Sequence, residues 1–336
     1  MNYIGSKHKL SDFIQSAIHN VVGKDLSRHV FCDLFAGTGI VGRKIKPDVK
    51  QVISNDLEYY SYVLNKNYIE NNHPMSTQPY LDALNALEGK GGMIFEEYSE
   101  NGRAGRLYFS EENGKKIDAV RQQIGHWKQQ GEITEAMYYF LLASLLESAD
   151  KVANTASVYG AFLKKLKKSA QKKLLIEPAT YDCTNSQHNR VYNQDSNQLI
   201  REITGDILYL DPPYNHREYG ANYHLLNTIA IYDSFEPKGV TGLRDYQRSD
   251  YCKKSTVEAS FEELIKNARF QFIFLSYNNE GLMSPTLIKE IMERYGQYTL
   301  FTTDYQRFKA DKTENRNHKA TATREYLHVL TKWKIE

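Results

Sequence analysis

The sequence Ile207-Leu208-Tyr209-Leu210-Asp211-Pro212-Pro213-Tyr214 decides how the chain is expected to fold. Its first four residues are a short apolar run preceded by Gly205-Asp206, a pattern that predicts a buried strand. The strand must end at the two prolines, because neither has a backbone N–H for the sheet ladder. Asp211 and Tyr214 then lie at the carboxyl end of a strand, where open α/β sheets bind ligands. Taken alone, the stretch equally describes a strand that stops at a turn, with Tyr214 as a packing aromatic.

Two further strands are expected upstream, each ending in an acidic residue. Val30-Phe31-Cys32 precede Asp33, and the loop Ala36-Gly37-Thr38-Gly39 lets the backbone approach a ligand closely, because glycine lacks a Cβ. Residues 52–56 end at Asp56, whose carboxylate is suited to accept hydrogen bonds from ribose hydroxyls. The alternative for Asp56 is that it caps the helix that follows.

These motifs, in this order and after Tyr3-Ile4-Gly5-Ser6-Lys7, resemble the amino-group DNA methyltransferases. The resemblance is to the adenine-N6 enzymes of the Dam-like (D12) class, which use S-adenosylmethionine, and it spans about the first two thirds of the chain. It implies an α/β fold: a Rossmann-like, mostly parallel methyltransferase sheet with a C-terminal antiparallel hairpin strand, plus a mostly helical target-recognition insertion. Glu325–Thr331 is one of the strands expected near the C-terminus.

The resemblance also implies the roles of individual residues. The catalytic residues are Asp211, Pro212 and Tyr214: the first two accept hydrogen bonds from the N6 amino group of adenine, and Tyr214 stacks on the flipped base. The implied cofactor contacts are Tyr3, Lys7, Asp33, Phe35, Ala36, Gly37, Thr38, Gly39, Asp56, Leu57, Asp195, Ser196 and Asp211. For Asp195 the alternative is again a helix N-cap.

The target atom is expected to be adenine N6. Cytosine-C5 transfer needs a cysteine after a proline, whereas Cys32, Cys183 and Cys252 follow Phe, Asp and Tyr. Enzymes that act on cytosine N4 usually carry Ser before Pro-Pro, so Asp211 points to adenine. The open alternatives are a methyltransferase that acts on RNA or on protein glutamine, and an inactive nucleic-acid-binding module.

The middle of the chain departs from the alternation of strand and helix. Residues 115–130 and 133–149 read as helices. The sequence therefore predicts a catalytic domain of residues 1–75 and 190–336, and a mostly helical insertion of residues 76–189 for target recognition and DNA binding.

Basic residues mark the expected contacts with DNA. Residues 151–173 carry seven lysines and no acid, which suits phosphate contact, although a solvated face is the plain alternative. A segment after the central motif, rich in Tyr, Arg and Asn, is expected to close over the target. The predicted DNA-binding residues are Lys164, Lys165, Lys167, Lys168, Arg217, Tyr219, Asn222, Tyr223, Lys309 and Lys312.

Composition limits the remaining choices. The 336 residues carry a formal charge of only +2, so the distribution of charge matters more than its total. The three cysteines match no metal or disulfide motif, so no metal site is predicted and a cytoplasmic location is expected. The amino terminus has no apolar signal core. The expected partners are double-stranded DNA and, functionally, a cognate restriction endonuclease.

Overall fold

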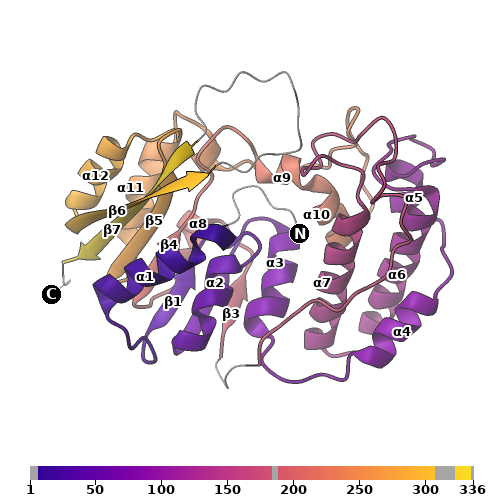
Figure 1. The fold of residues 1–336 in the computed structure, drawn as a ribbon, viewed down its shortest axis with the longest axis horizontal. Helices are drawn as coiled ribbons and strands as arrows, with labels where there is room; N and C mark the ends of the chain where they lie inside the picture. The colour runs from indigo at the N-terminus through magenta and orange to yellow at the C-terminus, as the bar shows by residue number, and fades with distance from the viewer. Residues whose placement is uncertain (1–6, 184–187, 307–321, 334–336) are drawn as a thin grey trace. The chain divides into compact units, whose positions relative to one another are not determined.

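The computed structural model describes residues 7–183, 188–306 and 322–333, and they form two compact units (Figure 1). The sheet unit comprises residues 7–57, 188–218, 247–306 and 322–333. The helical unit comprises residues 58–183 and 219–246.

The predicted domain boundaries differ from these. The helical unit begins at Glu58 rather than at residue 76. It also includes residues 219–246, which were expected in the catalytic domain. The assignment of target recognition to the helical part stays a prediction.

The sheet has seven strands in the order β3-β2-β1-β4-β5-β7-β6. Strands β1 to β5 pair in parallel, and the β6–β7 hairpin pairs antiparallel to β5. The predicted fold class is thereby confirmed. The strands are β1 (Val30–Asp33), β2 (Gln51–Asn55), β3 (Arg190–Tyr192), β4 (Ile207–Leu210), β5 (Phe272–Asn278), β6 (Gly296–Gln306) and β7 (Ala322–Lys332).

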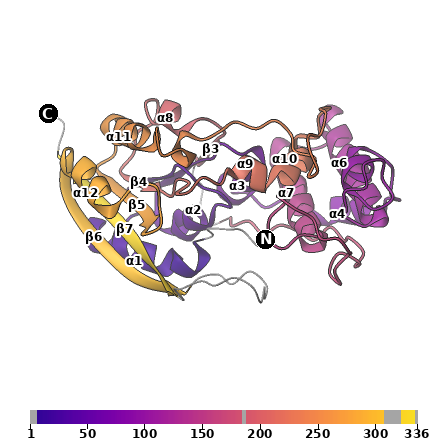
Figure 2. The same cartoon turned by 90° about the horizontal axis from the view of Figure 1, so that it is seen from above.

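Helices cover both faces of the sheet, and Figure 2 shows α1 and α11 on opposite sides of it. All four residues of β4 are buried, as expected for a central parallel strand. Leu208 and Leu210 pack in one core cluster with Phe261 of α11 and Ile288 of α12. The helices of this unit are η1 (His8–Leu10), α1 (Ser11–Val22), α2 (Ile40–Ile45), η2 (Lys46–Asp48), α8 (Ser196–Leu199), η4 (Asp250–Cys252), α11 (Val257–Asn267) and α12 (Pro285–Glu293).

The strand order places a switch point between β1 and β4. The chain passes from β1 to β2 and β3 on one side, then returns to β4 on the other side of β1. Asp33 at the end of β1 is in register with Tyr209 of β4. Such a switch point is where open α/β sheets bind ligands at the carboxyl ends of their strands.

The helical unit is built around two long helices that the sequence predicts. Ser110 and Thr134 cap α6 and α7, because their hydroxyls accept from the backbone N–H of Asn113 and Met137. The helices of this unit are α3 (Tyr59–Asn65), the π-helical η3 (Lys66–Glu70), α4 (Gln78–Ala86), α5 (Met93–Tyr98), α6 (Glu111–Gln129), α7 (Glu135–Val152), α9 (Tyr219–Asn222) and α10 (His224–Ile231).

Helix α10 joins this unit through α3. The side-chain oxygen of Asn227 accepts from the backbone N–H of Tyr60 at 2.9 Å, and the rings of Tyr60 and Tyr223 lie 5.6 Å apart. Both contacts are buried. They fix α3 and α10 against each other, which is why both elements fall outside the sheet unit.

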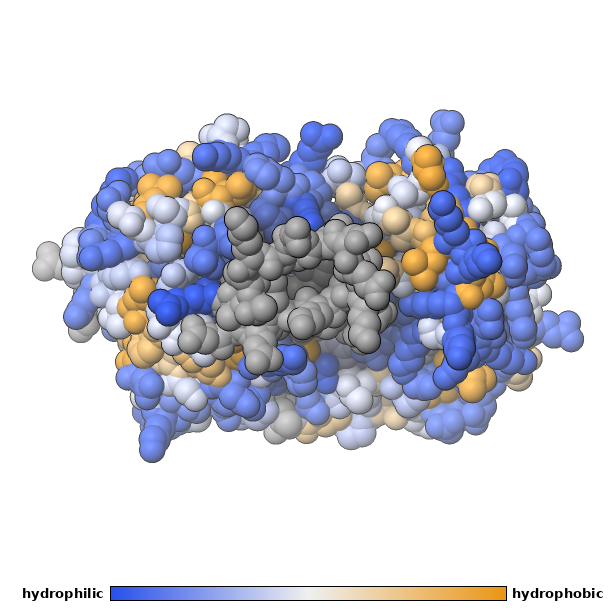
Figure 3. Space-filling view, turned by 45° about the horizontal axis from the view of Figure 1, so that its top comes forward, coloured by the Kyte–Doolittle hydropathy of each residue, from blue (hydrophilic) through white to orange (hydrophobic). Residues whose placement is uncertain are grey.

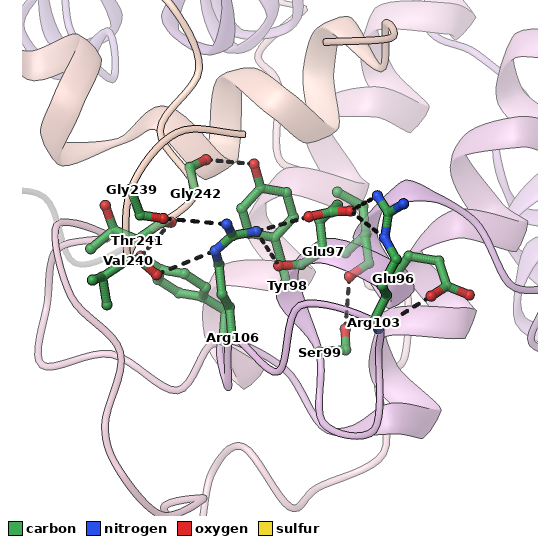
Figure 4. Close-up of polar contacts among 12 residues, drawn as sticks. Glu96, Glu97, Tyr98, Ser99, Arg103, Arg106, Gly239, Val240, Thr241 and Gly242 are labelled. Atoms are coloured by element: carbon green, nitrogen blue, oxygen red, sulfur yellow. Dashed lines mark hydrogen bonds and ion pairs between the residues drawn. The ribbon is translucent and has the colours of Figure 1, made fainter. Parts of the chain in front are cut away.

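The turn 239–242 is held by polar groups that reach its backbone carbonyls (Figure 4). The guanidinium of Arg106 donates to the carbonyls of Gly239 and Val240, and the Tyr98 hydroxyl donates to that of Gly242 at 2.6 Å. Glu97 forms an ion pair with Arg106. Backbone carbonyls are the same in every residue, so no pattern in the sequence of the turn indicates these contacts.

Residues 163–180, called the lysine strap below, include no helix or strand. Side chains of the helices hold its backbone instead. Asn113 donates to the carbonyls of Ala170 and Lys172 at 3.2 and 2.9 Å, and accepts from the N–H of Leu174 at 2.8 Å. Asn85 makes a similar pair of bonds with Ile176. An irregular segment is thus fixed in place because side-chain amides of the helices satisfy its backbone.

We expect Asn113→Ala to lower the free energy of unfolding by about 2 kcal/mol, because three hydrogen bonds are lost and their backbone partners stay partly buried. Urea unfolding measures the change. Gln171→Ala is the control on the same strap, since Gln171 is exposed and makes one bond to the Leu166 carbonyl. Equal effects of the two changes would contradict the anchoring role of Asn113.

The face seen in Figure 3 is mostly hydrophilic, with hydrophobic residues in small separate groups. Within residues 7–183, 188–306 and 322–333, no helix combines the length and the apolar character that crossing a bilayer requires.

Candidate active site

The carboxyl ends of β1, β2 and β4 bring together the residues that the sequence singled out. Asp33 ends β1 and is 1% exposed, Asp56 follows β2, and Asp211 follows β4. All three belong to the sheet unit. Each acidic residue is therefore at the strand end where the sequence predicts it, and Asp33 interacts electrostatically with both Asp56 and Asp211.

The glycine loop is closed against the end of β2. Gly37 and Gly39 have φ of 52° and 73°, the left-handed region that glycine adopts without strain. The N–H of Gly37 donates to Asp56 Oδ2 at 2.7 Å. The N–H of Ala36 donates to the Asn55 carbonyl at 2.9 Å. Loop and acid are thus one preformed structure rather than two separate motifs.

Asp195 follows β3 and caps α8. Its Oδ1 accepts from the N–H groups of Asn197 and Gln198, both at 3.0 Å. The N-cap alternative for Asp195 is therefore confirmed, and its contact with the cofactor stays a prediction. Ser196 is buried beside it, whereas Leu57 is partly exposed after β2.

The ammonium of Lys7 contacts two residues of the Asp-Pro-Pro-Tyr motif, Asp211 and Tyr214. Its Nζ is 2.9 Å from Asp211 Oδ1 and 5.7 Å from the centroid of the Tyr214 ring. The backbone carbonyl of Tyr214 accepts from the N–H of Leu282 at 3.0 Å. The ring of Tyr214 packs edge-on to Tyr277 at 6.1 Å. The motif is thus held both by charge and by packing.

The buried carboxyl groups of the site differ in their surroundings. Burial first, and then the nearby Asp211, raises the pKa of Asp33 to about 8, although the N–H of Gly42 opposes this. Burial also raises the pKa of Asp211, and the Lys7 ammonium opposes that shift. At neutral pH the uncharged form of Asp33 is therefore favoured, whereas Asp211 has a cation beside it that favours ionisation.

We expect the stability of the protein to fall as pH rises from about 4 to about 8, in part because Asp33 binds its proton more tightly when folded. Asp33→Asn removes this titration. Relative to the unchanged protein, the variant should gain about 1 kcal/mol of unfolding free energy for each pH unit in that window. Urea unfolding at several pH values measures the difference. Parallel curves for the two proteins would mean that folded Asp33 titrates in its ordinary range.

The structure also places the residues predicted to contact DNA. Lys164, Lys165 and Lys168 are exposed on the lysine strap. Lys167 is half-buried, and its Nζ donates to the Thr155 carbonyl at 2.6 Å. The exposed three fit phosphate contact better than Lys167 does.

One predicted DNA contact needs correction. Tyr223 is fully buried, stacked 6.1 Å from Tyr219 and packed on Tyr60, so its ring supports α9 and α10 and has no exposed surface for a base. Arg217 is exposed, and Asn222 is partly exposed while its carbonyl accepts from Tyr159.

Three predicted site residues lie outside the described ranges, so the structure adds nothing about them. They are Tyr3, Lys309 and Lys312.

One ionisable residue of the site carried no sequence signal. Glu325 on β7 is in register with Asn278 of β5, and it interacts electrostatically with Lys7 and Asp211. Burial raises the pKa of its carboxyl group. Glu325 comes near the Asp-Pro-Pro-Tyr motif because β7 returns antiparallel to β5, and no local sequence pattern predicts this proximity.

The sheet, its switch point and the Asp-Pro-Pro-Tyr motif beside a glycine loop define a Rossmann-like methyltransferase of the type that acts on amino groups. The chain belongs to the D12 class N6 adenine-specific DNA methyltransferases, since the model of that family matches residues 3–291. The predicted family and the predicted adenine-specific DNA methyltransferase activity are thereby confirmed.

Individual relatives agree with this family. The chain is 63% identical over 333 residues to the type II methyltransferase M.NlaIII of Neisseria lactamica, with 99% of both chains covered. It is 40% identical over 349 residues to the type II methyltransferase M.FokI of Planomicrobium okeanokoites, covering 99% of this chain and 53% of that one. It is 38% identical over 316 residues to M.CviAII of Paramecium bursaria Chlorella virus 1, covering 92% and 93%.

Proposed function

We propose that this enzyme is the modification methyltransferase of a restriction-modification system: it takes a methyl group from S-adenosylmethionine and places it on adenine N6 within one recognised sequence of duplex DNA. The main support is the single sheet edge where Asp33, the glycine loop, Asp56 and Asp211 lie. The relatives that carry the name type II methyltransferase support the link to restriction. A cognate endonuclease is then the functional partner.

The sheet edge suits a nucleoside cofactor. Gly37 and Gly39 have no side chain and take the left-handed conformation, which lets the backbone of the loop come close to a ligand. Asp56, after β2, is suited to accept hydrogen bonds from ribose hydroxyls, and Asp195, after β3, lies at the end of the neighbouring strand. S-adenosylmethionine, when bound, supplies an electrophilic methyl group on a positively charged sulfur.

The residues after β4 activate the weak nucleophile, the N6 amino group of adenine. The lone pair of adenine N6 is delocalised into the ring, so the amine attacks poorly. Hydrogen bonds from its two protons to the Asp211 carboxylate and the Pro212 carbonyl pull the nitrogen towards tetrahedral geometry. Tyr214 stacks on the base and fixes its plane. The N6–C bond would form as the bond between the methyl carbon and the donor sulfur breaks, which leaves a neutral thioether, and one N6 proton would leave to solvent. The preformed oxygens stabilise the positive charge that develops on nitrogen.

Access to N6 requires that the target nucleotide leave the duplex. Exposed lysines on the strap are suited to hold the phosphates of the DNA during this step, because phosphate contacts position a protein without reading sequence.

The test is methylation of mixed-sequence duplex DNA with labelled S-adenosylmethionine, followed by nucleoside digestion and mass spectrometry. The expected product is N6-methyl-deoxyadenosine, and sequencing of the marked DNA should show one recurring site. Label in N6-methyl-deoxyadenosine without a recurring site would overturn site specificity. Label on RNA or protein but not on DNA would overturn the proposed substrate.

A further inference from the structure

We propose that Lys7 is a positioning residue for the target amine: its ammonium keeps the Asp211 carboxylate charged and leaves one oxygen of that carboxylate for the N6 amino group. The resemblance implied a cofactor contact for Lys7, so this role is a different one. The inference rests on the proposed function of Asp211 and extends it to a residue near the start of the chain.

The geometry of the pair carries the inference. Lys7 Nζ lies 2.9 Å from Asp211 Oδ1, and the two side chains are 6% and 17% exposed. Oδ1 is itself buried, and among the described residues no hydrogen bond to it is recorded beyond this ion pair. The exposed part of the Asp211 side chain therefore excludes Oδ1, and Oδ2 is the oxygen left for a ligand. The ammonium also lies 5.7 Å from the Tyr214 ring.

The surrounding charges explain why a cation is needed there. Asp33 from β1 and Glu325 from β7 interact electrostatically with both Lys7 and Asp211, and Tyr209 of β4 interacts with Asp211. Burial by itself lowers the pKa of Lys7, but Asp211, Tyr214 and Glu325 together raise it above its ordinary value, so Lys7 stays protonated. One ammonium thus faces three buried or half-buried carboxyl groups.

The chemistry depends on which carboxyl group is ionised. A carboxylate accepts hydrogen bonds only, whereas a protonated carboxyl carries an O–H that competes with the N6 protons of the amine. Without Lys7, burial beside Asp33 would favour the protonated form of Asp211. Environments that separate the pKa values of neighbouring carboxyl groups in this way give those groups different chemical roles.

The test is the pH dependence of the single-turnover methylation rate in Lys7→Met, with Lys7→Gln as a second neutral variant that retains a hydrogen-bond donor. Asp211 acts in its ionised form, so a raised pKa moves the loss of activity at low pH to higher pH. We expect the acidic limb of the pH–rate profile to move up by about one pH unit or more, which costs about tenfold in rate on that limb and little on the plateau at high pH. Lys7→Arg should return the acidic limb of the pH–rate profile to its original position. Lys9→Met, at an exposed neighbouring lysine, should leave the profile unchanged.

Two results would overturn the inference. One is a rate loss of equal size at every pH. The other is a loss of affinity for S-adenosylmethionine, measured by calorimetry, with an unchanged pH profile, which would favour the cofactor contact instead. Failure of the proposed function is distinguishable: the unchanged enzyme would then form no N6-methyl-deoxyadenosine, or Asp211→Ala would keep the full rate.

Discussion

Asp211→Ala is expected to lower the single-turnover rate of adenine methylation by about 10³-fold, a far larger effect than its effect on the affinity for S-adenosylmethionine. The substitution removes the oxygen that accepts from N6 and that stabilises the charge developing on nitrogen. The rest of the sheet edge, with the Gly37–Asp56 contact at 2.7 Å, is left in place. Rapid-quench measurement of labelled DNA gives the rate, and calorimetry gives the affinity for the cofactor.

The control must separate chemistry from folding, because Asp211→Ala removes the carboxylate that lies 2.9 Å from the buried ammonium of Lys7. Breaking such a pair on one side destabilises a protein by about 3–5 kcal/mol. Lys7→Met combined with Asp211→Ala removes both charges, and it should regain stability without regaining rate. Glu202→Ala, at an exposed acid of the same unit, should change neither quantity. A double variant that methylates DNA at the normal rate would refute the role of Asp211.

The sequence predicts this site well where a motif and a strand end coincide. Residues 207–210 form β4 with the expected bounds, because an apolar run followed by two prolines leaves little choice. Glycines at 37 and 39 likewise occupy left-handed positions of the expected loop. In such places, local chemistry and the global fold require the same structure.

The sequence fails where partners are distant in the chain. Nothing near Lys7 indicates that its ammonium meets Asp211, and nothing near Glu325 indicates that it faces the same pair. The predicted boundary at residue 76 differs from Glu58 for a similar reason. A short helix that follows a strand is typical of the sheet unit, whereas contacts such as those of Tyr60 with Asn227 and Tyr223 assign α3 to the helical unit. Tertiary packing, rather than propensity, decides these cases.

Replacing Lys164, Lys165 and Lys168 together by Gln is expected to weaken binding to a mixed-sequence duplex by about 10²-fold at about 0.1 M salt. Each lysine that neutralises one phosphate releases counterions, so the slope of log K against log salt should become less steep by about 0.9 per lysine. All three side chains are exposed, and the buried amides that hold the strap do not depend on them. Fluorescence anisotropy across a salt series gives both quantities.

The helical unit offers a control with the same change in charge. Lys115, Lys151 and Lys238 lie outside the strap, and each forms an ion pair with a carboxylate, namely that of Glu111, Glu177 and Asp245. A cation that already has a carboxylate partner gains less from a phosphate, so their replacement by Gln should alter the salt slope far less. If both triple variants lose affinity equally, the effect comes from net charge alone and the strap has no special role. If only the triple variant of the strap loses affinity, and its methylation rate at saturating DNA is normal, then the strap acts in DNA binding and not in methyl transfer.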